Sequence, residues 1–222
     1  MVKVLELFSG THSVGKVATE MGWEVVSLDL QNADININIL NWNYMELKQN
    51  EFDIIWASPP CDTFSSIKKT HLGRKNKYGK IITSGDIRAD IDNIGLPILN
   101  KTLEIIAYFN PKYYFIENPQ SSSMKQYIDL PFYDVDYCQY ANWGYRKRTR
   151  VWTNLTEFIP QTCRQDCSSC INGKHLINIG MTTKKRISSV KSKYTKLNER
   201  YRIPPNLIKG LFNQISITRI LI

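Results

Sequence analysis

Two short apolar runs each end at a residue that can do chemistry. Residues 52–56 are followed by two prolines and Cys61, and residues 113–116 are followed by Glu117. Runs of this kind predict strands, and ligands of open α/β sheets bind at the carboxyl ends of the strands. If the two strands are neighbours, a thiol and a carboxylate share one crevice, which is a nucleophile arrangement. Taken singly, Cys61 fits a small buried hydrophobe and Glu117 a turn residue; their paired placement favours catalysis.

The N-terminal segment has the layout of a nucleoside-binding unit. Residues 2–7 predict a strand, Ser13 is a candidate cap for a helix to about Met21, and residues 23–28 predict a second strand that closes on Asp29. Gly10 lies in the turn between strand and helix, and an acid after the second strand can accept both ribose hydroxyls. A GxGxxG pattern is absent, which argues against a pyrophosphate cofactor. A ligand with one ribose and one carboxylate, such as S-adenosylmethionine, fits this pattern.

Length and composition predict one globular domain. The chain has 222 residues, of which 42% are hydrophobic and 22% charged. No apolar stretch approaches the roughly 20 residues that cross a bilayer, and the N-terminus lacks the layout of a signal peptide. We therefore expect a monomer without a membrane partner in the cytoplasm or nucleus. Thiols stay reduced there, so the five cysteines point to catalysis or metal binding rather than to disulfides.

Basic residues exceed acidic ones and are clustered. The formal net charge is +9, and residues 184–202 carry eight Lys or Arg with a single Glu. This asymmetry favours a nucleic-acid partner, although a solvated basic face gives the same count. A second cluster, residues 146–150, lies within a predicted strand over 144–153. There Arg146, Arg148 and Arg150 point to one face, while Lys147 and Thr149 point to the other. These guanidinium groups suit a phosphate or a base carbonyl, or simply form a charged edge strand.

Four further stretches have a composition that predicts their structure or role. Residues 62–87 are polar and lack hydrophobic periodicity, which favours a lid over the site. Pro97 opens a predicted helix to about Phe109, and Pro204-Pro205 opens a last helix through Ile215 or beyond. Between them lies a loop with the ligand types of a structural zinc site. Its predicted ligands are Cys163, Cys167, Cys170 and His175; free surface thiols are the alternative.

The order of these motifs resembles the cytosine-C5 methyltransferases, in the compact form carried by phages and large DNA viruses. The matching segments span about two thirds of the chain: Leu7-Phe8-Ser9-Gly10, Asp29-Leu30, Ser58-Pro59-Pro60-Cys61, Glu117-Asn118-Pro119 and Arg148-Thr149-Arg150. The resemblance implies a class I S-adenosylmethionine-dependent fold, α/β with a doubly wound, mostly parallel sheet. It also implies an origin in a virus or phage, with action in the host cell.

The resemblance also implies roles for individual residues. Cys61 would attack C6 of cytosine after the base is flipped out, and Glu117 would hold N3. Arg150 would hold the base carbonyl, while Arg148 steadies the site or contacts the backbone. The implied cofactor residues are Phe8, Ser9, Gly10, Thr11, Asp29, Leu30, Asn38 and Pro60. Asn38 stands where the family often has an acid.

The family comparison also suggests a plan for the whole chain. Residues 1–154 would form the catalytic core, 155–202 a small recognition region with the zinc loop, and 203–222 a helix returning to the core. Because the recognition region is short, a short target in double-stranded DNA is expected. Two alternatives stay open: an RNA cytosine-C5 methyltransferase, and a non-catalytic nucleic-acid-binding zinc module on a methyltransferase scaffold.

Overall fold

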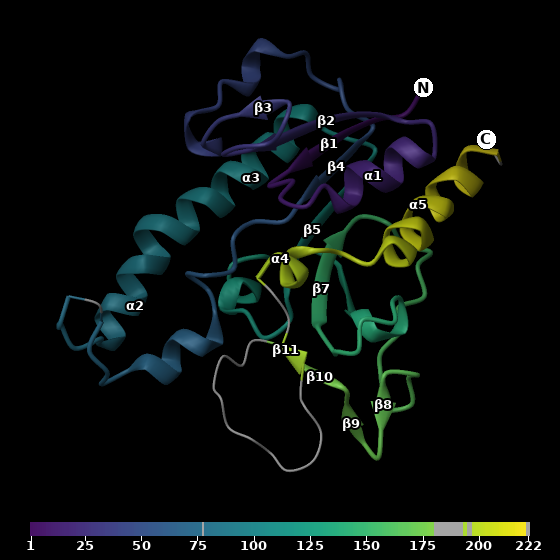
Figure 1. Ribbon diagram of the computed structural model, residues 1–222. Helices are drawn as coiled ribbons and strands as arrows, with labels where there is room; N and C mark the ends of the chain where they lie inside the picture. The colour runs from purple at the N-terminus through teal and green to yellow at the C-terminus, as the bar shows by residue number, and fades with distance from the viewer. Residues whose placement is uncertain (77, 180–192, 195–196, 221–222) are drawn as a thin grey trace.

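A seven-stranded sheet in the order β3-β2-β1-β4-β5-β7-β6 forms the centre of the computed structural model (Figure 1). The structure describes residues 1–76, 78–179, 193–194 and 197–220. The strands are β1 Lys3–Leu7, β2 Glu24–Asp29, β3 Ile35–Asn36, β4 Ile54–Ala57, β5 Tyr113–Pro119, β6 Phe132–Asp136 and β7 Arg148–Thr153. All neighbours are parallel except β7, which is antiparallel to β5 and β6. The predicted doubly wound, mostly parallel sheet is confirmed, and the strand order reverses between β1 and β4.

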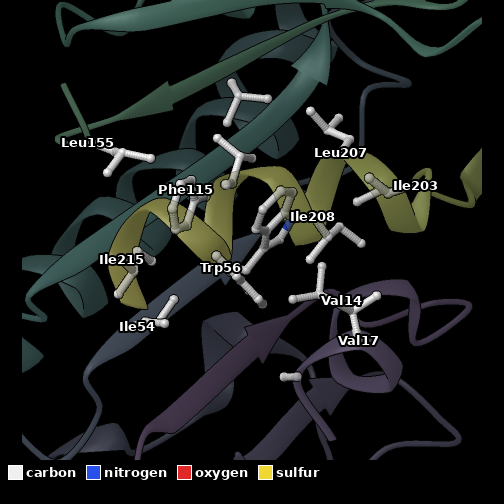
Figure 2. Packing of buried hydrophobic residues seen from close by; sticks show 14 of the residues in the cluster. Val14, Val17, Ile54, Trp56, Phe115, Leu155, Ile203, Leu207, Ile208 and Ile215 are labelled. Atoms are coloured by element: carbon white, nitrogen blue, oxygen red, sulfur yellow. The ribbon is translucent and has the colours of Figure 1, made fainter. Parts of the chain in front are cut away.

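Helices cover both faces of the sheet (Figure 1). On one face, α1 (Ser13–Glu20) lies beside α5 (Pro205–Ile220), and on the other α3 (Leu96–Phe109) packs against the strands. Figure 2 shows apolar side chains of α5 meeting Trp56 of β4 and Phe115 of β5, whose rings stack with centroids 5.1 Å apart. The predicted final helix therefore does return to the core, through Leu207, Leu211 and Ile215.

The helix expected from Pro97 is the last part of a longer helical segment. It is preceded by α2 (Ser84–Asp90) and a π-helical turn (Ile91–Gly95), so α2 includes the end of the stretch predicted as a lid. The buried residues of α3 are Leu99, Thr102, Ile105 and Phe109. Leu103 and Ile106 of the same helix are only half-buried and pack against the cluster that contains Leu99 and Met124.

Shorter elements connect this framework. Short 3-10 helices occupy Ile39–Asn41, Tyr44–Glu46, Ser66–His71, Ser123–Gln126 and Tyr137–Gln139. The α-helix α4 spans Leu197–Tyr201. Two small sheets follow β7: β8 Cys170–Ile171 with β9 Lys174–His175, and β10 Ile177–Asn178 with β11 Lys193–Tyr194. Most of the basic stretch predicted over 184–196 lies outside the described residues. Within the described part of the chain, no helix has the length and hydropathy needed to span a membrane.

The start of α1 differs from the prediction. Ser13 is not the cap: the capping position is His12, in a left-handed conformation, and its side chain makes no capping bond. The carboxylate of Glu6 in β1 accepts the first amides instead, from Val14 at 3.1 Å and Gly15 at 2.9 Å. A Cβ on Gly15 would lie 2.7 Å from a Glu6 oxygen, so only glycine permits this approach. Glu6 of β1 thus fixes the start of α1, the helix that follows the loop after this strand.

Glu6 is expected to make stability fall as pH rises. Burial raises its pKa to about 7, although the two amide hydrogen bonds oppose the shift. Because the folded pKa exceeds the unfolded value, the folded state binds the proton more tightly, and this contribution is lost as pH rises from about 4.5 to about 7. The free energy of unfolding should drop by at most about 3 kcal/mol from this group.

Denaturant titrations of wild type and Glu6→Gln at pH 5 and pH 8 test this expectation. From pH 5 to pH 8, the free energy of unfolding should fall more for wild type than for Glu6→Gln. Any loss of stability that the substitution causes equally at both pH values cancels in this comparison. Parallel pH curves would contradict it.

Candidate active site

The carboxyl ends of β1, β2, β4 and β5 converge at one edge of the sheet. Because these strands are mutually parallel in register, the residues that follow each of them meet at this edge. Gly10 follows β1, Asp29 ends β2, Cys61 follows β4, and Glu117 lies near the end of β5. This edge, where the strand order reverses, is the position at which open α/β sheets bind ligands. The predicted neighbourhood of the thiol and the carboxylate is therefore present.

Hydrogen bonds fix the loop that carries Cys61. The Asn118 side-chain amide donates to the Pro59 carbonyl at 2.9 Å, which ties the end of β5 to the proline pair. The Ser58 amide donates to the Leu7 carbonyl at 3.2 Å, and the Trp56 indole donates to the Ser58 hydroxyl at 3.2 Å. Two prolines lack amide donors and have restricted φ, so few conformations remain. The sequence pattern Pro-Pro-Cys and the buried Asn118 together position the thiol.

Cys61 is half-buried, and its surroundings favour the neutral thiol. Burial raises its pKa, and the negative charges of Asp62 and Glu117 raise it further, whereas the Lys147 ammonium lowers it. A nucleophilic thiol in this setting must lose its proton as it attacks. Tyr201, at the end of α4, also lies within electrostatic reach of Cys61.

Glu117 is buried, with 6% of its surface exposed. Its Oε1 accepts a hydrogen bond from the Tyr137 hydroxyl at 2.9 Å and lies 3.4 Å from Lys147 Nζ. The same ammonium donates to the Arg200 carbonyl of α4 at 3.2 Å and lies 4.8 Å from the centre of the Tyr137 ring. With 13% of its side chain exposed, Lys147 is a partly desolvated charge beside the carboxylate and the thiol.

Arg148 and Arg150 are not brought to this group. In an antiparallel pair, directly opposed side chains share a face, and β7 sets Val151 opposite Glu117 but Arg150 opposite Asn118. Both arginines therefore lie on the other face. There Arg150 pairs with Asp134 at 2.8 Å, and Arg148 pairs with buried Asp136 at 2.7 Å.

Lys147 lies beside Glu117, although the sequence analysis did not name it as a candidate site residue. Alternation along residues 146–150 did separate Lys147 and Thr149 from the arginines, but it could not say which face holds Glu117. That choice depends on the register between β5 and β7, which joins segments far apart in the sequence.

The loop between β1 and α1 has an unusual backbone. Phe8 and His12 both have positive φ, 60° and 55°, a conformation that is uncommon for residues other than glycine. The Asp29 carboxylate accepts the Gly10 amide at 2.8 Å and the Leu30 amide at 2.6 Å. The ends of β1 and β2 are thereby joined, and strained residues of this kind cluster at ligand sites.

The side chains around this loop fit a nucleoside ligand. Ser9 Oγ is buried without a hydrogen-bond partner among the described residues, so it is free to bind a polar ligand group. Leu30 exposes 69% of its surface directly after β2, where a base could cover it. Thr11 Oγ1 lies 2.8 Å from Ser13 Oγ, and Asn38 Oδ1 accepts the Leu40 amide. Asn38 therefore caps its own 3-10 turn, while Pro60 is exposed beside Cys61.

A group of three cysteines and one histidine lies near the carboxyl end of β6. The ligand atoms of Cys138, Cys163, Cys167 and His175 all lie within 4.8 Å of one another. Three of these residues were predicted as ligands. The fourth prediction, Cys170, does not belong to the group; it faces His175 across the β8–β9 pair. Cys138 replaces it because the turn after β6 packs against the loop. The group is compatible with zinc.

Comparisons with known proteins agree with the architecture. No protein-family model matches the chain. Among solved structures, the Entamoeba histolytica methyltransferase EhMeth has a TM-score of 0.51 at 17% identity, covering 72% of this chain and 55% of that chain. The Dnmt2 methyltransferase of S. pombe gives a TM-score of 0.43 at 14% identity, covering 72% and 51%. The first of these likenesses supports the class I methyltransferase fold and nothing further.

A protein of Frog virus 3 (isolate Goorha), named probable DNA (cytosine-5)-methyltransferase, is much more similar. It is 41% identical over 223 residues, covering 96% of this chain and 99% of the relative. The alignment thus spans nearly the whole length of both chains. The chain therefore belongs to the DNA (cytosine-5)-methyltransferase family.

Proposed function

We propose that this enzyme transfers a methyl group to C5 of cytosine in double-stranded DNA by a covalent mechanism that uses Cys61. The observation that carries the proposal is the meeting of Cys61, Glu117 and Lys147 at the carboxyl edge of the sheet. The 41% identical viral relative supports the DNA substrate and favours a viral origin for this chain.

The chemistry requires a nucleophile because C5 of cytosine is too electron-poor to take a methyl group unaided. Cys61 sulfur would form a bond to C6 as its proton passes to solvent water, and the electron pair of the C5–C6 double bond would move through the ring toward N3. S-Adenosylmethionine supplies the methyl group and leaves as S-adenosylhomocysteine. Water would then take the C5 proton, which re-forms the C5–C6 double bond and expels the Cys61 thiolate.

Glu117 and Lys147 stabilise the charge that this addition creates. Glu117 would hold N3 and supply the proton that neutralises the charge developing there, in place of the interactions that it now makes with Tyr137 and Lys147. Lys147 offers a fixed positive charge at the edge of the ring, and a charge that is already oriented costs no reorganisation during reaction. We assign to Lys147 the role that the family resemblance gave to Arg150. Arg148 and Arg150 instead brace β7 against β6 through their acidic partners.

The cofactor would lie over the loop after β1. Asp29 would bind the ribose, Leu30 would cover the adenine, and the amide-rich turn with Ser9 would hold the methionine part. The exposed Leu30 and the unpaired Ser9 hydroxyl support this placement.

A base stacked in a duplex cannot reach a carboxylate as buried as Glu117. The cytosine would therefore be flipped out of the helix, as other enzymes that act on bases require. The stretch over residues 62–83, with its lysines, is placed after Cys61 and would close on the bound strand. The short segment after β7 limits recognition to a short target.

Methyl transfer to matched substrates tests the proposal. The enzyme is incubated with S-adenosylmethionine carrying a labelled methyl group and with duplex DNA or structured RNA of the same sequence, and nucleosides are analysed by mass spectrometry. We expect 5-methylcytosine in the DNA alone. Label in the RNA alone would replace the DNA assignment with the RNA alternative. Absence of label in both, together with no binding of S-adenosylmethionine, would favour a non-catalytic nucleic-acid-binding module.

A further inference from the structure

We infer that Cys138, Cys163, Cys167 and His175 bind a structural zinc ion that clamps the segment after β7 onto the catalytic core. The ligand set differs from that predicted by loop spacing, because one ligand comes from the core itself. Cys138 lies in the turn directly after β6, whereas the other three belong to residues 163–175. The ion would thus bridge two parts of the chain rather than close a knot within one loop.

The ligand atoms already have the spacing of a zinc tetrahedron. His175 Nε2 lies 3.6 Å from Cys163 Sγ and 3.4 Å from Cys167 Sγ. With ordinary zinc–sulfur and zinc–nitrogen bonds at tetrahedral angles, the sulfur–nitrogen separation is roughly 3.6 Å. Cys138 lies within 4.8 Å of the other three and fills the remaining corner. Three thiolates and an imidazole form a closed structural set, without an open position for catalysis.

Backbone and side-chain contacts support the ligands. The buried Asp136 carboxylate accepts the Cys163 amide at 2.7 Å and also pairs with Arg148. The Gln165 amide points at the Cys163 sulfur at 3.2 Å, which stabilises a thiolate. Such outer contacts orient ligands and are a regular part of metal sites.

The two parts of the chain meet closely around the cluster. The Ile177 amide donates to the Gly144 carbonyl at 2.8 Å. Gly144 has φ of 81°, and a Cβ there would lie 2.9 Å from the Ile177 side chain, so glycine is required at this contact. Ser168 donates to Asn142, and Gln139 donates to Asp166 at 3.1 Å. The ion would add direct bonds between the two parts to these contacts.

The clamp lies next to the proposed active site. Cys138 follows Tyr137, whose hydroxyl donates to Glu117 and whose ring lies beneath Lys147. Fixing Cys138 therefore restrains the residue that orients Glu117. This consequence rests on the proposed function, whereas the metal site does not.

Measuring the zinc content of purified wild type and of single-cysteine variants tests the inference. We expect about one zinc ion per chain in wild type and in Cys170→Ser, and loss of the ion in Cys138→Ser. Cys170→Ser is the matched control because Cys170 lies in the same loop but outside the cluster. Cobalt substitution adds a spectroscopic test: thiolate-to-cobalt absorption should be present in wild type and Cys170→Ser and weakened in Cys138→Ser.

Stability provides an independent measurement if a variant fails to fold. A strong chelator should lower the Tm of wild type by roughly 5 to 10 °C, and added zinc should restore it. Zinc retained by Cys138→Ser but lost by Cys170→Ser would restore the loop-only ligand set and overturn our assignment. Wild type purified without zinc, and unable to bind added zinc or cobalt, would overturn the metal site itself. Neither result depends on methyl transfer.

Discussion

Cys61→Ser is expected to abolish methyl transfer, with a loss of at least about 10⁴-fold, as for the removal of other covalent nucleophiles. Serine fills nearly the same volume, and the loop is held by Asn118 and Ser58 rather than by the thiol. Folding and S-adenosylmethionine binding should therefore stay close to wild type. Single-turnover kinetics and a cofactor-binding titration measure the two effects separately.

Trapping with 5-fluorocytosine in duplex DNA reports the bond itself. After methyl transfer, the fluorine on C5 cannot leave as the proton does, so the enzyme should stay attached to C6. The complex should form with wild type in the presence of S-adenosylmethionine and be absent with Cys61→Ser. Cys170→Ser, which changes a cysteine outside the site, is the control and should form it. A complex that survives in Cys61→Ser would remove Cys61 from the mechanism.

Lys147→Met is expected to lower kcat by about 10²-fold or more, the usual effect of removing one preorganised charge from a transition state. Its ammonium is the cation that contacts Glu117, and it also favours the Cys61 thiolate. Arg150→Met is the comparison, because its guanidinium lies on the other face and pairs with Asp134. It should reduce stability modestly and leave kcat near the wild-type value.

Two measurements separate catalysis from folding in this pair. The first is kcat at saturating DNA, corrected for the folded fraction; the second is the Tm of each variant. Lys147→Arg should recover part of the lost kcat, since it restores charge but not the compact shape of an ammonium. A large loss of kcat in Arg150→Met, with little change in Lys147→Met, would return the base-binding role to Arg150 and refute our assignment.

The sequence by itself determined the parts of this protein that depend on neighbouring residues. A buried strand that ends in Pro-Pro predicted the position of Cys61, and β4 does stop at Ala57, just before this loop. The pattern from β1 to Asp29 predicted the nucleoside-binding unit because strand, turn, helix and acid follow one another directly. Local hydrophobic periodicity and proline placement likewise predicted the helices that begin near Pro97 and Pro205.

The tertiary structure alone decided which side chains face each other across the sheet. Moving a strand by one residue exchanges its two faces, so the register of β5 with β7 selected Lys147 over Arg150 as the neighbour of Glu117. Distance along the chain also hid Cys138 as the companion of Cys163. Each of these contacts joins elements that meet only after the sheet has formed, and spacing within one segment carries no information about such a meeting.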